Sequence, residues 1–303
     1  MIMKTIIFSI CMTFVCGNIL YAQPKMIEIK TKKDYQLKEN VKQVVNNTTD
    51  MILKFTPEGY LQFFGFLKDG ELQGSTYMYD KAGHMLKDNN YWNKYTYIYS
   101  YNSEGLMVEE KLMVGSKCSS IKSFLYDMNG NARQETLDFT NGIKTIYMLK
   151  NRYDSQKRLI KIERFEPYEK LPFVTDIAYL PNGWRRHIHR DNSSETVIEY
   201  DNKGRIRSHI LKQISTKESS KFSKKYDDNY NLVESLSDFS TSTLYTYNAQ
   251  KELIVQEDIA LDGNRTKTTY TYTKHDAKGN WTERIAENNG KQSTETRTIE
   301  YYN

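Results

Sequence analysis

One seven-residue pattern recurs along most of this chain and limits what it can fold into. Its consensus is an aromatic residue, Asp or Asn, two variable residues, Gly, a variable residue and an apolar residue, as in YDKAGHM. Ten copies stand 21 to 28 residues apart and begin at Phe55, Tyr79, Tyr101, Tyr126, Tyr153, Tyr179, Tyr200, Tyr226, Tyr247 and His275. Repetition at a nearly fixed interval is typical of proteins that stack one small unit many times.

Each place in this motif has a physical reason. An aromatic residue suits the end of a strand, and Asp or Asn can bond to the backbone ahead and open a turn. Gly stands at the fifth place in seven of the ten copies, where it permits a positive φ. The seventh place starts the return strand and is usually apolar, with Ala132 and Arg185 as exceptions. The pattern therefore predicts a turn between two strands, here named the motif turn.

A second set of turns falls midway between the motif turns. Its strongest members are Asp69-Gly70, Asn141-Gly142, Asp262-Gly263 and Asn289-Gly290, which are pronounced hairpin signals. Strands joined alternately by motif turns and these midpoint turns form a continuous antiparallel meander. The sequence thus predicts an all-β fold of roughly twenty strands, each about 6 to 9 residues long.

Tyrosine supports this prediction. The chain has 24 tyrosines, and this residue favours a pleated, half-buried surface. In residues 95–101 every second residue is Tyr, and strict alternation places these rings on one face of a sheet. Thr, Ser, Lys and Glu dominate the opposite face. A row of rings can stabilise the sheet through cross-strand contacts or serve as a stacking platform for sugar rings.

The tandem Tyr-Asp-x-x-Gly-x-Leu core resembles the YD repeats, also called RHS (rearrangement hot spot) repeats. The copies at Tyr79, Tyr126 and Tyr200, and Asp276 with Gly279, match best, and the resemblance covers about residues 50–303. It implies an antiparallel strip of β-hairpins that curls or spirals, which in large members forms a hollow shell around a cargo. The C-terminal residues are similar to the last unit of small exported Bacteroidetes-type members. We expect no enclosed cargo and no toxin-like C-terminal domain.

The N-terminal segment reads as a targeting signal. Residues 5–20 form an apolar run after Lys4, with a cleavage site after Ala22. We therefore expect a signal peptide over 1–22, a lead-in over 23–49 and a repeat domain of about ten hairpin units over 50–303. The lead-in reads as a strand at 26–30, a charged loop and a strand at 41–47. Export to the periplasm, the outer surface or the medium follows, without stable membrane insertion after cleavage.

Charge and cysteine content exclude several classes of protein. Loss of Lys4 lowers the formal net charge from +5 to +4, and the charges are interspersed, which argues against a nucleic-acid partner. Cys118 is the cysteine that remains after cleavage, so no internal disulfide is expected.

No catalytic or cofactor motif is recognisable. The sequence lacks GxSxG, HExxH, a phosphate loop and CxxC, so we expect neither an active site nor a cofactor. His187 and His189 would share a strand face, but two ligands without a third favour surface histidines over a metal site. Carboxylates on return strands could meet at the separation used by glycosidases: Glu109, Glu110, Glu163, Glu234, Glu257 and Glu283.

The leading hypothesis is a non-catalytic binding or scaffolding protein of the cell envelope that contacts a glycan or a protein, since repeats offer extended surfaces. The candidate ligand contacts are Trp92, Trp184, Trp281, Tyr97 and Tyr99. The alternative is an enzyme that acts on polysaccharide through facing carboxylates. A third hypothesis is self-association through the edge strands of an open strip.

Overall fold

The computed structural model describes residues 29–169, 171–191, 193–214, 216, 218–227 and 231–303. The expected signal peptide and most of the expected strand at 26–30 lie outside the described residues. A short 3-10 helix, η2 (Lys32–Tyr35), forms within the expected charged loop. The described chain contains 22 strands, somewhat more than the roughly twenty expected.

The strands follow one another along the chain with short connections. The first eleven are β1 (Val41–Asn46), β2 (Met51–Phe55), β3 (Leu61–Lys68), β4 (Glu71–Tyr79), β5 (Met85–Asn90), β6 (Tyr95–Tyr101), β7 (Met107–Val114), β8 (Lys117–Tyr126), β9 (Ala132–Phe139), β10 (Lys144–Tyr153) and β11 (Leu159–Phe165). The others are β12 (Phe173–Tyr179), β13 (Arg185–Arg190), β14 (Ser194–Tyr200), β15 (Ile206–Gln213), β16 (Ser219–Tyr226), β17 (Leu232–Ser237), β18 (Ser242–Tyr247), β19 (Leu253–Ile259), β20 (Arg265–His275), β21 (Trp281–Asn288) and β22 (Lys291–Tyr301).

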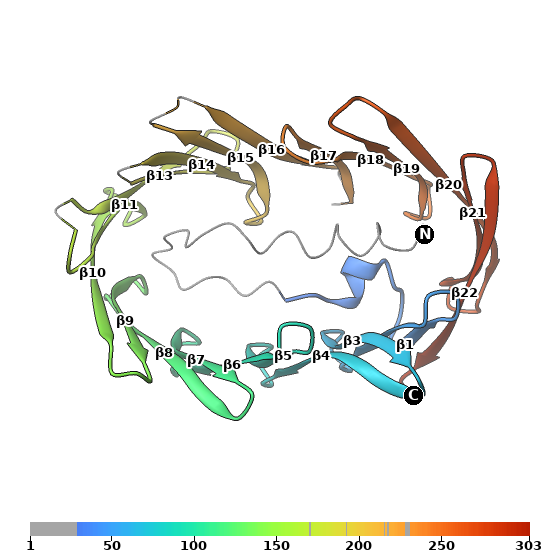
Figure 1. The fold of residues 1–303 in the computed structure, drawn as a ribbon, viewed down its shortest axis with the longest axis horizontal. Coiled ribbons are helices and arrows are strands. Elements are labelled where there is room, and N and C mark those ends of the chain that lie inside the picture. Colours follow the sequence, from blue (N-terminus) through green and yellow to red (C-terminus); the bar gives the residue numbers. More distant parts are fainter. Residues whose placement is uncertain (1–28, 170, 192, 215, 217, 228–230) are drawn as a thin grey trace.

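The sheet closes into a barrel. Each strand pairs antiparallel with the next, as the alternating turns predict, and β1 also pairs antiparallel with β22, with Val44 opposite Ile299. Figure 1 shows the resulting flattened ring, in which the first and last strands meet. The all-β meander is confirmed, but the expected open, curled or spiral strip is wrong. Because the terminal strands pair with each other, self-association through free edges would first require this seam to open, and it stays a prediction.

Asp or Asn at the second place of the motif builds the turn as expected. Asp80 Oδ1 accepts hydrogen bonds from the backbone N–H groups of Ala82 and His84 at 2.8 and 2.9 Å. The same bonds, to the fourth and sixth places, recur at Asn102, Asp127, Asp154, Asp201 and Asp276. The fifth place has positive φ, at 89° for Gly83 and at 58° for Lys157, where the motif lacks Gly. This conformation explains the glycine preference.

A β-bulge accompanies nearly every motif turn. Met78 lies opposite Lys87 whereas Tyr79 lies opposite Met85, so Leu86 is an extra residue on the return strand. An equivalent register shift occurs at nine of the ten motif copies, and the copy at Tyr179 lacks it. A bulge bends its strand and increases local twist. Repetition of the same bend at the same end of the sheet explains why a single layer curls far enough to close.

Tyrosine hydroxyl groups tie neighbouring hairpins together. The Tyr79 hydroxyl donates to the Leu61 carbonyl at 2.7 Å, and Leu61 is the seventh place of the preceding motif. Tyr101, Tyr126, Tyr179, Tyr247 and Tyr272 donate in the same way to Met85, Met107, Leu159, Leu232 and Leu253. Where the seventh place is Ala132, the Asn151 side chain takes over this role at 2.9 Å.

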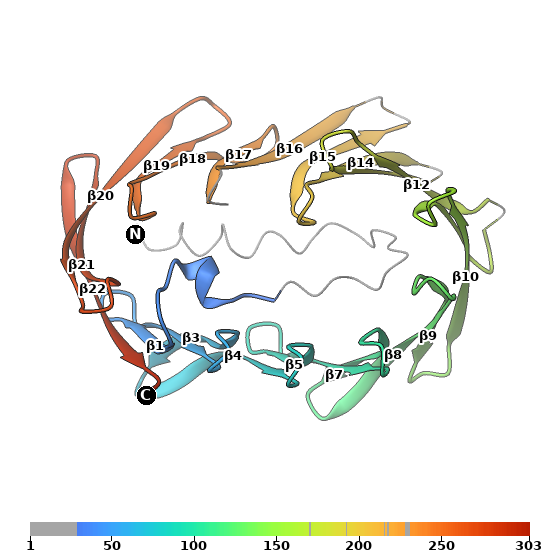
Figure 2. The ribbon, with the colours of Figure 1, turned by 180° about the vertical axis from the view of Figure 1, so that it is seen from behind.

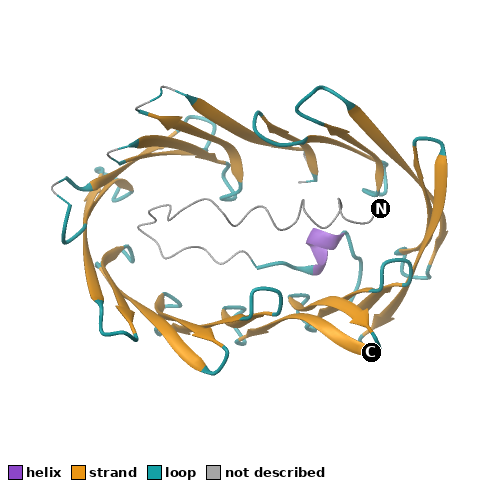
Figure 3. Ribbon diagram, in the orientation of Figure 1, coloured by secondary structure: helices purple, strands orange, loops and turns teal. Residues whose placement is uncertain are grey.

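Motif aromatic residues face the inside of the ring, where Phe55 packs on the lead-in and Tyr79, Tyr101 and Tyr126 join a cluster that includes Ile29 of the lead-in. Helix η2 lies inside it in Figure 1, and Tyr35 of this helix contacts Phe55 with ring centroids 5.7 Å apart. Phe55 belongs to a core cluster with Leu37, Val44 and Leu53. Figures 2 and 3 show that the motif turns are among those that curve into the ring, whereas several midpoint turns, such as that between β19 and β20, project outward.

The lead-in fastens the seam of the barrel. Asn280 is 2% exposed and accepts a hydrogen bond from the Lys38 backbone at 2.8 Å. Its amide group donates to the Lys38 carbonyl at 3.1 Å and to the Tyr301 hydroxyl at 2.8 Å. One side chain therefore joins the lead-in, the last motif turn and the last strand.

Replacement of Asn280 by Ala should weaken this seam. We expect the free energy of unfolding to fall by about 2–3 kcal/mol, because buried backbone groups lose their partners. Chemical denaturation measures the loss, and amide exchange should accelerate in β1 and β22 before it does in β7 and β8. The matched control is Asn264→Ala in an exposed midpoint turn, for which about 0.5 kcal/mol or less is expected. Equal effects of the two variants would contradict the seam assignment.

Candidate functional site

An exposed aromatic cluster lies at the β5–β6 turn. Trp92 is 46% exposed and Tyr91 is 45% exposed. The Trp92 ring rests on Phe64 and Phe66, with centroids 5.5 and 6.4 Å apart, and meets Tyr91 edge-on at 6.0 Å. Phe64 packs against the core cluster that contains Leu53, so the Trp92 ring is supported from behind on the inner face. An exposed ring held in this way is preorganised for stacking.

Two other candidate ligand contacts lie in the wall next to this cluster. Tyr97 and Tyr99 of β6 stack with centroids 6.2 Å apart and planes at 9°. Tyr99 is 7% exposed and packs with Met85, Met107 and Phe124, and its burial raises the pKa of its hydroxyl group. These positions give both rings a role in packing, and their contact with a ligand stays a prediction.

Guanidinium groups cover the remaining two candidate contacts. Arg207 lies over the Trp184 ring at 5.1 Å from its centroid. Arg297 and Arg284 lie over Trp281 at 3.8 and 4.6 Å, distances at which cation–π attraction is substantial. Trp92 is thus the one exposed residue among the five candidates, and ligand binding by the others stays a prediction.

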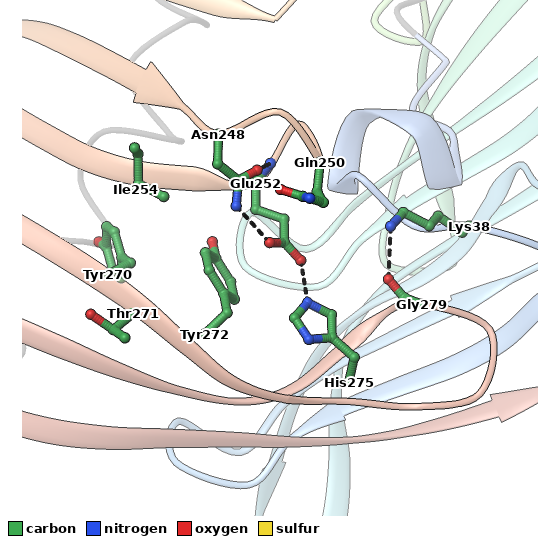
Figure 4. Close-up of a pocket in the computed structure, with 10 residues that line it drawn as sticks. All are labelled: Lys38, Asn248, Gln250, Glu252, Ile254, Tyr270, Thr271, Tyr272, His275 and Gly279. Carbon is green, nitrogen blue, oxygen red and sulfur yellow. Dashed lines mark hydrogen bonds and ion pairs between the residues drawn. The ribbon is translucent and has the colours of Figure 1, made fainter.

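A hollow of about 580 Å³ opens on the inner wall between the last two motif turns. Figure 4 shows its polar centre, where Asn248 and His275 point toward Glu252. Glu252 is 7% exposed; His275 Nε2 lies 2.6 Å from Oε1, and Asn248 Nδ2 donates to Oε2 at 2.8 Å. Tyr270 and Tyr272 line one side and Lys38 the other. We call this hollow the Glu252 niche.

A second hollow, of about 610 Å³, lies between the motif turns at Tyr126 and Tyr153. The Tyr153 hydroxyl donates to Asp127, and Asn151 donates to the same carboxylate at 2.9 Å. Met128, Asn129 and Arg133 complete the lining, and we call this hollow the Asp127 niche. Neither niche was predicted from the sequence. A signal was present at the sixth place of the motif, where some copies carry an ionisable residue. This residue pairs with the Asp or Asn at the second place of the same copy, as Glu252 does with Asn248 and His84 does with Asp80.

Of the two histidines of β13, His189 is buried and His187 is half-buried, contrary to the surface positions expected from sequence. His189 is 8% exposed, and its Nδ1 lies 2.7 Å from the hydroxyl of Thr175. The rings of His187 and His189 lie 6.0 Å apart, and the Nε2 atom of each is buried without a hydrogen bond in the described part of the chain. Burial lowers the pKa of both imidazoles to about 4, and the neighbouring His189 and Arg185 contribute for His187.

The carboxylates considered for catalysis are largely held by cations. Glu109 pairs with Lys111 at 2.9 Å, Glu257 with Arg265 at 3.0 Å and Glu283 with Lys274 at 2.8 Å. The hydrogen bond from Lys274 lowers the pKa of Glu283. Within the described residues no group of three or more His, Cys, Asp or Glu side chains is placed to hold a metal ion, and Cys118 is a free thiol. Catalysis by facing carboxylates stays a prediction.

No protein-family model and no curated protein matches the chain. Among solved structures, it is similar at 12% identity to chains in a TcdB2-TccC3-Cdc42 complex (TM-score 0.29; 82% of this chain and 17% of that one) and in the Photorhabdus luminescens Tc holotoxin pore (TM-score 0.28; 83% and 18%). A porin-like protein from Bacteroides uniformis gives 10% identity and a TM-score of 0.23, over 88% of this chain and 98% of that one.

This chain therefore spans less than a fifth of the two toxin chains. Among the residues described, no helix has the length and apolar character needed to cross a membrane.

The buried histidines predict a stability that depends on pH. Between pH 6.5 and about 4 the unfolded chain binds protons that the folded chain excludes, so the free energy of unfolding falls as the pH falls. For His189 the expected loss is on the order of 3 kcal/mol between pH 7 and pH 4. Denaturation at a series of pH values measures it. The His189→Gln variant should be less stable at pH 7, but its free energy of unfolding should fall less as the pH is lowered, and the same holds for His187→Gln. If the free energy of unfolding of both variants changed with pH as that of the unmodified protein does, the assignment would be wrong.

Proposed function

We propose that this protein is an exported, non-catalytic binding protein of the cell envelope that holds a glycan against the inner wall of its barrel. The observation that carries the proposal is the exposed Trp92 ring, held in place by Phe64 and Phe66. Aromatic rings present a flat apolar surface with specific stacking geometry, and the C–H faces of a sugar ring are complementary to such a surface.

Polar groups on the same inner face support this choice of ligand. The Glu252 niche combines Tyr270 and Tyr272 with Asn248, Gln250 and Glu252. Apolar and aromatic walls with a few placed polar groups are typical of small-molecule sites. Amides and carboxylates accept and donate the hydrogen bonds that sugar hydroxyl groups require.

The repeat itself supports a place among the small YD-repeat proteins. Its second-place hydrogen bonds, positive φ at the fifth place and tyrosine bonds between units occur in successive copies. This placement rests on the motif, and it accompanies the proposed location in the periplasm, on the outer surface or in the medium.

Replacement of Trp92 by Ala tests the proposal. We expect the dissociation constant for the best ligand among cello-, laminari-, malto- and chito-oligosaccharides to rise about tenfold, because the stacking surface is lost. Isothermal titration calorimetry on residues 23–303 measures the change, and Trp92→Phe should retain part of the affinity. Tyr168→Ala is the matched control, since Tyr168 is 92% exposed in the outward β11–β12 turn. No binding in the whole panel, or equal losses in both Ala variants, would contradict the proposal.

A further inference from the structure

The two hollows on the inner wall occupy the same place in the repeat. Counting from the motif aromatic residue, Asn248 and Asp127 are at the second place, Gln250 and Asn129 at the fourth, and Ile254 and Arg133 at the eighth. Each hollow is closed on its other side by tyrosines of the strand that leads to the next motif turn, Tyr272 in one and Tyr153 in the other. Each niche is therefore a product of the repeat.

Some of these places hold side chains that stabilise the turn, and others hold side chains that are exposed. The second place is committed to the turn through its bonds to the backbone. The fourth place contributes its backbone N–H group to the turn but not its side chain, and Gln250 and Asn129 are exposed at the mouths of their niches. The eighth place is the extra residue of the bulge, since Ile254 and Arg133 are skipped in the strand register. The bulge thus opens the wall at the point where the niche forms.

Spacing follows from the meander. Neighbouring motif turns are two strands apart, so a niche at every motif turn would recur roughly every 10 Å along the wall. The Glu252 and Asp127 niches themselves lie in units ten strands apart, on opposite sides of the ring in Figure 1. Such a row would follow the curve of the inner wall, and the fourth place of the motif is polar in every copy except the one with Ala82.

We propose that the niches between neighbouring motif turns are a row of equivalent subsites that bind successive units of one linear polysaccharide. This inference rests on the proposed function and specifies its ligand as a polymer with exposed hydroxyl groups. Amide side chains at the fourth place supply both donors and acceptors to such groups. Occupation of one niche holds the next unit of the same chain near its neighbour, which raises the effective concentration there.

The test is a titration of residues 23–303 with oligosaccharides of increasing length, from monomer to octamer, in the series that binds best. We expect the dissociation constant to fall about tenfold once the chain is long enough to reach a second niche. Gln250→Ala and Asn129→Ala should each raise the dissociation constant of the longest oligomer about threefold, because a hydrogen bond is lost. Gln292→Ala, an exposed amide beside the β21–β22 midpoint turn, is the matched control.

The outcomes separate this inference from the proposed function. Affinity that rises with length and falls in the two niche variants alone supports the row of subsites. Affinity that is independent of length and of both niche variants overturns it, even where Trp92→Ala abolishes binding and so preserves the proposed function. A lower affinity in the niche variants, together with an unchanged affinity in Trp92→Ala, overturns the Trp92 site and preserves the row of subsites. Absence of binding throughout the series overturns both.

Discussion

The hydrogen bonds made by Asp or Asn at the second place of most motif turns fix the geometry from which the barrel follows. Asp80 holds the backbone N–H groups of the fourth and sixth places, so the chain always reverses over the same number of residues. The return strand then carries one residue too many, which the sheet absorbs as a bulge. Because the bulges repeat on one side of one layer, their bends add, and β22 meets β1. Closure satisfies the backbone groups that an open strip would leave at its edges.

A single closed layer has no second sheet to pack against, and the inner face compensates in two ways. Tyrosine side chains lie along the wall and donate to carbonyl groups of the preceding hairpin, as Tyr101 does to Met85. Apolar residues gather in separate clusters along the ring, around Phe55, Ala132 and Met85. Stability is therefore distributed along the repeat, and local changes such as acidification near His189 act on one section of wall.

Local features of this fold could be predicted from the sequence, because turns are decided by neighbouring residues. Asp at the second place and Gly at the fifth have the roles that the motif indicates. Closure could not be predicted, since it depends on residues 41–46 meeting 297–301 and on the sum of many small bends. Burial of His189 also escaped prediction, because a hydrogen bond to Thr175 on the next strand compensates a polar residue that alternation alone leaves ambiguous.

The candidate site shows the same division. Trp92 could be selected because it lies in a turn, but its support by Phe64 and Phe66 requires contacts between strands that are distant in sequence. The niches lie on the inner face, where some motif residues are needed for the fold and others remain exposed to a ligand. Side chains that build the turn or make the tyrosine hydrogen bonds between hairpins are not free to contact a ligand. The fourth place gives only its backbone N–H group to the turn, and its side chain is exposed at Gln250 and Asn129. A repeat that assigns folding and exposure to different places can vary its fourth-place residues from copy to copy while it keeps the same barrel.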